Sequence, residues 1–293
     1  MTDAAAPPAS ALDIEHLRGW IGRSEEQVDV AEPSRFAALA AWLDHRTPPW
    51  PADELPPLGH WLCFLPIALQ SQLTPDGHPP RGGLIPPVPL PRRMWAGSKV
   101  EFLRPAPLGA TLRRCASVAD VALKSGGSGD FVRVSLLNEI FVGADLAIRE
   151  RQDIIYRPAA DEASAPSSAG RIAAPASEPF DYARAVMPDP AMLFRFSALT
   201  FNAHRIHYDR DYARDVEAYP GLVVHGPMQA MLLLDLYLRR EGGGPVRGFS
   251  CRAQRPLFDG APFQLKGRQT ESGARLWSED ARGQLCMEAS VTR

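Results

Sequence analysis

The chain has 293 residues, of which 45% are hydrophobic and 23% are charged, and its net charge at pH 7 is −2. This composition is typical of a soluble globular protein with one or two domains. The small charge gives no electrostatic basis for binding nucleic acid or an anionic membrane. No apolar run reaches the roughly 20 residues that span a bilayer, and the N-terminus lacks the pattern of a secretory signal. The four cysteines are widely spaced, which favours buried thiols in a reducing compartment, so we expect a cytoplasmic protein.

The N-terminal part predicts two short helices, a long irregular loop and four strands. The first helix carries Ile14, Leu17 and Ile21 on one face, and the second begins at Pro33. From residue 47 to residue 91 proline and glycine are too frequent for regular structure, but interleaved tryptophans and aliphatic residues favour a packed loop that covers something. Runs rich in Val, Ile and Phe predict strands at 98–103, 111–124, 130–141 and 149–157, with a glycine-rich hairpin turn between the second and third.

An Ala/Ser/Pro-rich stretch then predicts a linker between two units. We expect an N-terminal unit at 1–157, the linker at 158–178 and a C-terminal unit at 179–293, which closes with three or four strands. The pattern Arg104-Pro105 followed by Gly109 recurs 151 residues later as Arg255-Pro256 followed by Gly260. Because the pattern follows and precedes a predicted strand both times, it favours two similar units in tandem.

A buried helix is predicted in the C-terminal unit. Residues 228–238 are apolar on nearly every side, which indicates burial on most faces. The helix begins at Gly226-Pro227, and glycines 242–244 end it. The first amides of a helix lack an intrahelical partner, so the amide near Gly226 can donate to a carbonyl oxygen or an anion. The alternative interpretation is a tight turn that only leads into the helix.

Just before this helix the sequence F-S-A-L-T-F-N-A-H-R-I-H-Y-D concentrates polar side chains. Asn202, His204, Arg205 and His207 fall within six residues, and an imidazole suits proton transfer near neutral pH. For His204 a buried histidine bonded to the backbone is an equal alternative. No third ligand follows the histidine pair at a familiar spacing, so we expect no metal. His60 and His78, in the proline-rich loop, carry no motif and are assigned no role.

The motif segment and L-V-V-H-G-P resemble the MaoC-like hot-dog hydratases and dehydratases, and are most similar to the type 2 hydroxyacyl-thioester dehydratase group. That group includes mesaconyl-C4-CoA and itaconyl-CoA hydratases. The segment R-G-G-L-I-P-P-V-P-L-P-R-R-M-W-A-G resembles the N-terminal half of the same group. The resemblance implies an α+β double hot dog, in which each of two tandem units is a curved antiparallel sheet around a central helix, and only the C-terminal unit is catalytic.

The resemblance also implies a site. General MaoC-type enzymes carry D-x-N-P-x-H, in which the Asp and the His are the acid and base. His207 matches that His, whereas Asn202 stands in the place of the Asp. We expect His207 to be the acid/base, Asn202 its orienting partner, and the Gly226 amide the donor to the thioester oxygen. His204, Arg205 and His225 are expected to assist substrate binding, with Arg205 as a surface or CoA-phosphate contact and His225 orienting the helix start. No cofactor is implied.

The function that follows is a hydratase that adds water to the double bond of a short, branched enoyl-CoA, of the mesaconyl-C4-CoA or itaconyl-CoA type, giving citramalyl-CoA. A 3-hydroxyacyl-thioester dehydratase of fatty-acid metabolism is the nearest alternative. A thioesterase is disfavoured because Asn202 replaces a carboxylate, and the same replacement leaves open a non-catalytic acyl-CoA-binding module. The expected partner is an acyl-CoA thioester. The identity of the acyl group, CoA versus carrier protein, and pairing into a homodimer are left open.

Overall fold

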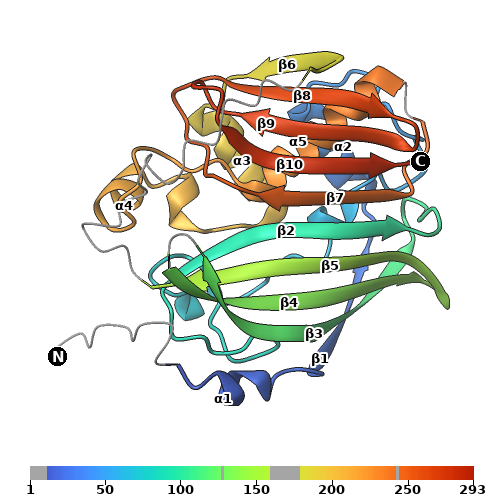
Figure 1. The fold of residues 1–293 in the computed structure, drawn as a ribbon. Coiled ribbons are helices and arrows are strands. Elements are labelled where there is room, and N and C mark those ends of the chain that lie inside the picture. Colours follow the sequence, from blue (N-terminus) through green and yellow to red (C-terminus); the bar gives the residue numbers. More distant parts are fainter. Residues whose placement is uncertain (1–11, 127–128, 159–178, 242–243) are drawn as a thin grey trace.

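The computed structural model describes residues 12–126, 129–158, 179–241 and 244–293. Ten strands form one sheet in the order β1-β3-β4-β5-β2-β7-β10-β9-β8-β6, and every neighbouring pair is antiparallel. The strands are β1 (Ser24–Val30), β2 (Arg92–Phe102), β3 (Thr111–Gly126), β4 (Gly129–Val142), β5 (Asp145–Arg157), β6 (Tyr182–Val186), β7 (Gly248–Ala253), β8 (Phe263–Thr270), β9 (Gly273–Glu279) and β10 (Leu285–Thr292). Helices α2, α3 and α5 lie behind this sheet in Figure 1.

The described helices are few and mostly short. They are α1 (Ile14–Arg18), α2 (Pro33–Trp42), α3 (Pro190–Thr200), α4 (Arg210–Asp215) and α5 (Gly226–Glu241), with 3₁₀ turns η2 (Gly59–Leu62), η3 (Gln70–Gln72) and η5 (Arg205–His207). In the part of the chain that the structure describes, none of them has the length and apolar character needed to cross a bilayer. The combination of one large antiparallel sheet with a few helices agrees with the predicted α+β class.

The two halves of the sheet have the same strand order. The N-terminal half runs β1-β3-β4-β5-β2 and the C-terminal half, read inwards, runs β6-β8-β9-β10-β7, so β2 and β7 meet in the middle. At this junction Gly97 lies opposite Arg252. A Cβ atom at Gly97 would lie 2.2 Å from the Cys251 carbonyl oxygen, so the close approach of the two halves requires a glycine.

The repeated Arg-Pro pattern forms the same corner in each half. Arg104-Pro105 follows β2 and precedes β3, and Arg255-Pro256 follows β7 and precedes β8. Gly109 and Gly260 end the two corners with φ angles of 78° and 83°. The sequence repeat therefore reflects a repeated strand–turn–strand structure. The predicted unit boundaries remain a prediction, because most of the 158–178 linker lies outside the described residues.

Several elements are longer than predicted or were not predicted. Strand β2 begins at Arg92, six residues before the predicted start, and part of the glycine turn before β4 lies outside the described residues. The two outermost strands were missed. β1 reads S-E-E-Q-V-D-V and β6 has only five residues, so neither carries the continuous apolar run that identifies an internal strand.

Helix α5 is buried, as its apolar sequence predicts. It packs against β8, β9, β10 and β2, and its residues belong to one core cluster with α2 and α3. Asp235 interrupts its apolar sequence because two arginines and a histidine hold this carboxylate inside the protein: Arg239 Nε lies 2.8 Å away, Arg184 2.9 Å and His45 Nε2 2.5 Å. Buried charges persist only when they are paired in this way. The ion-pair cluster ties α5 to the end of α2 and to β6.

The N-terminal half has no counterpart of α5 among the described residues. Its longest helix there is α2, which has ten residues against sixteen in α5 and follows β1 as α3 follows β6. Between α2 and β2 the described chain forms only the short turns η2 and η3 and irregular loops. The inner face of the N-terminal sheet is therefore left to line a groove.

Candidate active site

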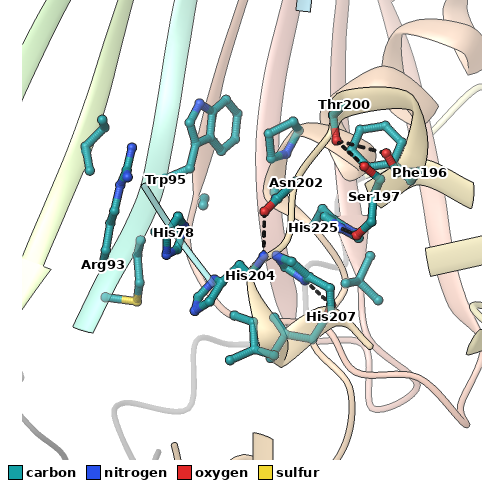
Figure 2. A pocket seen from close by; sticks show the side chains of 18 of the residues that line it. His78, Arg93, Trp95, Phe196, Ser197, Thr200, Asn202, His204, His207 and His225 are labelled. Atoms are coloured by element: carbon teal, nitrogen blue, oxygen red, sulfur yellow. Dashed lines mark hydrogen bonds between the residues drawn. The ribbon is translucent and has the colours of Figure 1, made fainter. Parts of the chain in front are cut away.

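One groove of ≈ 2360 Å³ is lined by residues of both halves. The C-terminal half contributes α3, the motif segment and the start of α5. The N-terminal half contributes the proline-rich loop and side chains from β2, β3, β4 and β5. Leu65, Leu84 and Ile85 of that loop line the groove, in agreement with the prediction that the loop covers something. The polar groups gather where the two halves meet (Figure 2).

His207 is buried in the 3₁₀ turn η5, and its ring has a defined hydrogen bond. Nδ1 lies 2.7 Å from the carbonyl oxygen of Val223. Because a carbonyl only accepts, Nδ1 carries the hydrogen, and the neutral ring then has a basic Nε2. Burial, with a smaller effect of repulsion from His204 when that ring is protonated, lowers the pKa of His207 to about 3. His207 is thus a neutral imidazole with one nitrogen free to accept a proton.

His225 supports the His207 ring from behind. The two rings are stacked, with centroids 3.6 Å apart and planes inclined by 17°. His225 Nε2 lies 2.9 Å from the hydroxyl of Ser197 on α3, and its carbonyl accepts the amide of Gln229 in the first turn of α5. Burial, with a contribution from His207, holds the pKa of His225 well below its usual value. His225 is therefore neutral too, and links the helix start to the ring of His207.

Asn202 and His204 form the turn that leads to His207. The Asn202 side-chain oxygen accepts the backbone amide of His204 at 3.0 Å. The ring partner of His207 is thus the Val223 carbonyl, whereas Asn202 holds the backbone of the motif. The buried His204 ring stands perpendicular to His207 at 5.5 Å, and burial, with a smaller effect of His78, lowers its pKa to about 3.

The N-terminal half adds Asp76 and His78, which were not predicted from sequence. His78 Nδ1 donates to Asp76 at 3.0 Å, and the His78 ring lies 4.2 Å from His204. Burial opposes ionisation of Asp76, but hydrogen bonds from His78 and Thr74 outweigh it and hold the pKa of Asp76 well below its usual range. Burial lowers the pKa of His78 despite this partner. His78 is a loop residue, as expected, but its ring contacts the motif, which the sequence did not show.

The loop that carries Asp76 and His78 is docked on the motif through the backbone. The amide of Arg205 donates to the carbonyl of Asp76 at 2.9 Å. A Cβ atom at Gly77 (φ +91°) would lie 1.9 Å from the carbonyl oxygen of Ala203, so glycine is required there. The sequence P-D-G-H-P signals only a turn. What it could not show is which distant segment the turn contacts.

Gly226 lies against the ring of Trp95. A Cβ atom at Gly226 would lie 2.6 Å from Trp95 Cε3, so the glycine makes room for an indole from β2. Gly226 is also the first residue of α5 and lines the groove. Its amide therefore stands at a helix start, where amides lack an intrahelical acceptor.

Arg205 is the one predicted site residue that does not line the groove; Asn202, His204, His207, His225 and Gly226 all do. Its guanidinium binds Asp209 at 2.7 and 3.0 Å and the carbonyl of Pro75 at 3.1 Å, and it stacks on Tyr212. These contacts fasten the 74–78 loop to α4. Arg205 is therefore committed to protein partners.

Asp76, His78 and His204 are the one group in the described ranges whose donor atoms lie close enough to hold a metal ion, all within 4.8 Å of one another. His78 Nδ1 and one Asp76 carboxylate oxygen are joined by a hydrogen bond of 3.0 Å. A metal bound through these two atoms would have to replace that hydrogen bond.

Comparison with known proteins agrees with this geometry. Residues 58–259 match the family described as hydroxyacyl-thioester dehydratase type 2. The chain is 46% identical over 280 residues to the mesaconyl-C(4)-CoA hydratase of Chloroflexus aurantiacus, covering 93% of this chain and 96% of that protein. Two solved structures share the fold: a MaoC-like dehydratase from Phytophthora capsici (TM-score 0.66, 15% identity, 96% and 98% covered) and a double hot-dog protein from Mycobacterium tuberculosis (TM-score 0.54, 13% identity, 98% and 97% covered).

The fold is a double hot dog of the MaoC-like class, as predicted, and the named hydratase and dehydratase relatives define a hydro-lyase. The family match spans more than half of the chain and includes the whole motif segment. The chain belongs to the hydroxyacyl-thioester dehydratase type 2 family.

Proposed function

We propose that this protein hydrates the double bond of a short, branched enoyl-CoA that carries a free carboxylate, of the mesaconyl-C4-CoA type, to give citramalyl-CoA. The carrying observation is His207, a neutral imidazole whose Nδ1 is fixed by Val223 and whose Nε2 is free. The 46% identity with a mesaconyl-C(4)-CoA hydratase supports the substrate class. Itaconyl-CoA, whose hydration gives the same product, is the second substrate to test.

The proposed reaction adds one water molecule across the double bond. His207 Nε2 takes a proton from water as the oxygen bonds to the β-carbon, and the π electrons move towards the thioester oxygen. The Gly226 amide donates to that oxygen, a contribution of about 3 kcal/mol for one such donor in other enzymes. The protonated His207 then returns the proton to the α-carbon, so hydrogen and hydroxyl are both accounted for. The growing negative charge raises the pKa of the nearby imidazole, which makes it a stronger base at that moment.

The remaining site residues are assigned positioning roles. Asn202 holds the backbone amide of His204, and His225 holds the plane of the His207 ring. We assign Asp76 to the part that the motif carboxylate plays in related enzymes, because its carboxylate, paired with His78, reaches the same histidine cluster from the other half of the chain.

The test follows the loss of enoyl-thioester absorbance with mesaconyl-C4-CoA and crotonyl-CoA, and the formation of citramalyl-CoA by chromatography with itaconyl-CoA, whose double bond is not conjugated with the thioester. Turnover by the native chain should fall by about 10²–10⁴-fold in His207→Ala, while His16→Ala, an exposed histidine outside the groove, should keep it. Unchanged turnover in folded His207→Ala would remove His207 from the mechanism. If the native protein turns over none of these enoyl-CoA thioesters, the proposed function is overturned.

The dehydratase alternative uses the same residues in the reverse direction, and the family description favours keeping it. Incubating the protein with a straight-chain 3-hydroxyacyl-CoA separates the two. Faster dehydration of that thioester than hydration of mesaconyl-C4-CoA would favour the alternative. A cytoplasmic location and a homodimer stay predictions.

A further inference from the structure

Arg93 is a cation in the groove that has no anionic partner. It lies on β2, lines the groove and is half-buried. Among the described residues, no carboxylate pairs with it and no hydrogen bond engages its guanidinium. Its neighbour Arg92 differs, because Arg92 lies 3.5 Å from Glu217 and donates to the Tyr219 hydroxyl at 2.9 Å. Burying an unpaired guanidinium is costly, so such a residue is expected to meet an anion when the protein works.

The position of Arg93 is beside the proton-transfer groups. Figure 2 shows Arg93 and Trp95 on β2, with His78 between this strand and the motif histidines. The charge of Arg93 acts on both His78 and His204 and helps to keep these rings neutral. An anion held by Arg93 would therefore lie next to the reacting atoms.

The charges around Arg93 leave room for one negative charge. Tyr156, which lies opposite Arg93 on the neighbouring strand β5, is buried and uncharged. Arg81 is bound by the backbone carbonyls of Val88, Leu90 and Pro91, which carry no net charge. Among the described residues, Asp76 is the carboxylate whose charge acts on Arg81 and on Tyr156, and it is paired with His78. With neutral histidines, two cations face one anion.

We propose that Arg93 binds the free carboxylate of the acyl group, and so selects CoA thioesters of dicarboxylic acids over CoA thioesters whose acyl group is uncharged. In a C4 thioester of mesaconate the free carboxylate is attached directly to the double bond, so its anchor must lie beside the acid/base residues and not at the mouth of the groove. A planar guanidinium matches a carboxylate with two parallel hydrogen bonds. The assignment of a dicarboxylic substrate rests on the proposed function, whereas the binding preference does not.

Binding of two unreactive thioesters tests the proposal without requiring turnover. Succinyl-CoA and butyryl-CoA have acyl chains of equal length and differ in a terminal carboxylate against a methyl group. The affinity of each is measured by isothermal titration calorimetry, with freshly prepared ligand, for the native chain, Arg93→Gln and Arg93→Lys. Arg92→Gln is the matched control, because it removes the adjacent arginine of the same groove, which is already paired.

The native chain should bind succinyl-CoA about 100-fold more tightly than butyryl-CoA, the range expected for a charge-assisted pair in a half-buried site. Arg93→Gln should abolish this preference and leave butyryl-CoA within about threefold. Arg93→Lys should keep part of it, and Arg92→Gln should keep all of it. If Arg93→Gln does not fold, Arg93→Lys still tests the proposal, because its preference for succinyl-CoA should be weaker than that of the native chain.

Three results would overturn the proposal: no preference in the native chain, an unchanged preference in Arg93→Gln, or an equal loss for both ligands. The last would place Arg93 on a phosphate of CoA. Failure of the proposed function looks different. A native chain that prefers succinyl-CoA through Arg93 but hydrates no enoyl-CoA would keep the binding site and refute the hydratase.

Discussion

The protonation state of His207, on which the proposed mechanism depends, can be tested through the stability of the protein. The pKa of this ring is about 3 in the folded chain, against an ordinary value of 6.5, because of burial and, to a smaller extent, repulsion from His204 when that ring is protonated. Below pH 6.5 the unfolded chain therefore takes up a proton on this residue that the folded chain does not. The contribution of the neutral His207 to the free energy of unfolding is fully present above pH 6.5 and is lost as the pH falls towards 3.

The expected magnitude follows from the two pKa values. A pH of 5.0 lies 1.5 units below the pKa of His207 in the unfolded chain, and each unit corresponds to about 1.36 kcal/mol. Protonation of His207 in the unfolded chain therefore lowers the free energy of unfolding by about 2 kcal/mol between pH 7.5 and pH 5.0. His207→Asn keeps a donor for the Val223 carbonyl and cannot titrate. The loss of unfolding free energy on acidification should therefore be about 2 kcal/mol smaller in the variant than in the native chain.

The assay is urea unfolding at pH 7.5 and pH 5.0 at constant ionic strength, followed by circular dichroism. Effects of the other titrating groups appear in both proteins and cancel in the difference between them. Gln229→Met serves as the control, because it changes a buried groove residue that does not titrate. Equal losses in the native chain and His207→Asn would show that His207 titrates alike in the folded and unfolded chains, which would refute the lowered pKa assigned to this ring.

Three further predictions follow from the site and the core. Gly226→Ala places a Cβ atom 2.6 Å from Trp95 Cε3, so thermal unfolding should show a loss of about 1–3 kcal/mol, part of which Trp95→Leu should restore. Asp76→Asn should lower kcat at least about tenfold in the absorbance assay; an unchanged kcat would leave this carboxylate a purely structural part. Leu233→Ala on α5, which is fully buried, should cost about 2–5 kcal/mol in urea unfolding, and a cost below about 1 kcal/mol would contradict the packing described for α5.

The C-terminal half was largely predictable because its signals are local. The apolar run after Gly226 marks a buried helix, and the histidine-rich segment before it marks the site. Five of the six predicted residues line one groove. Their roles in catalysis stay predictions, and the partner of the His207 ring could not be foreseen, because it is a backbone carbonyl that any residue at position 223 would supply.

The contribution of the N-terminal half was not predictable from its residues. His78 and Arg93 become site residues only because the 74–78 loop docks on the motif and β2 pairs with β7. Both contacts join segments more than a hundred residues apart in the chain. A loop sequence gives its own turn chemistry but not the surface on which it docks, and a strand sequence does not show what its side chains will face.

Among the described residues the N-terminal half has no counterpart of α5, so the two halves differ in what they contribute to the groove. The C-terminal half contributes α5 and the proposed proton-transfer residue His207, whereas the N-terminal half leaves the inner side of its sheet open to the groove, where Leu136, Ile140 and Ile154 form an apolar wall. Substitutions in this wall change the space for the acyl group without touching His207. A chain with two halves of the same strand order can acquire new substrates by altering one half while selection preserves the chemistry of the other.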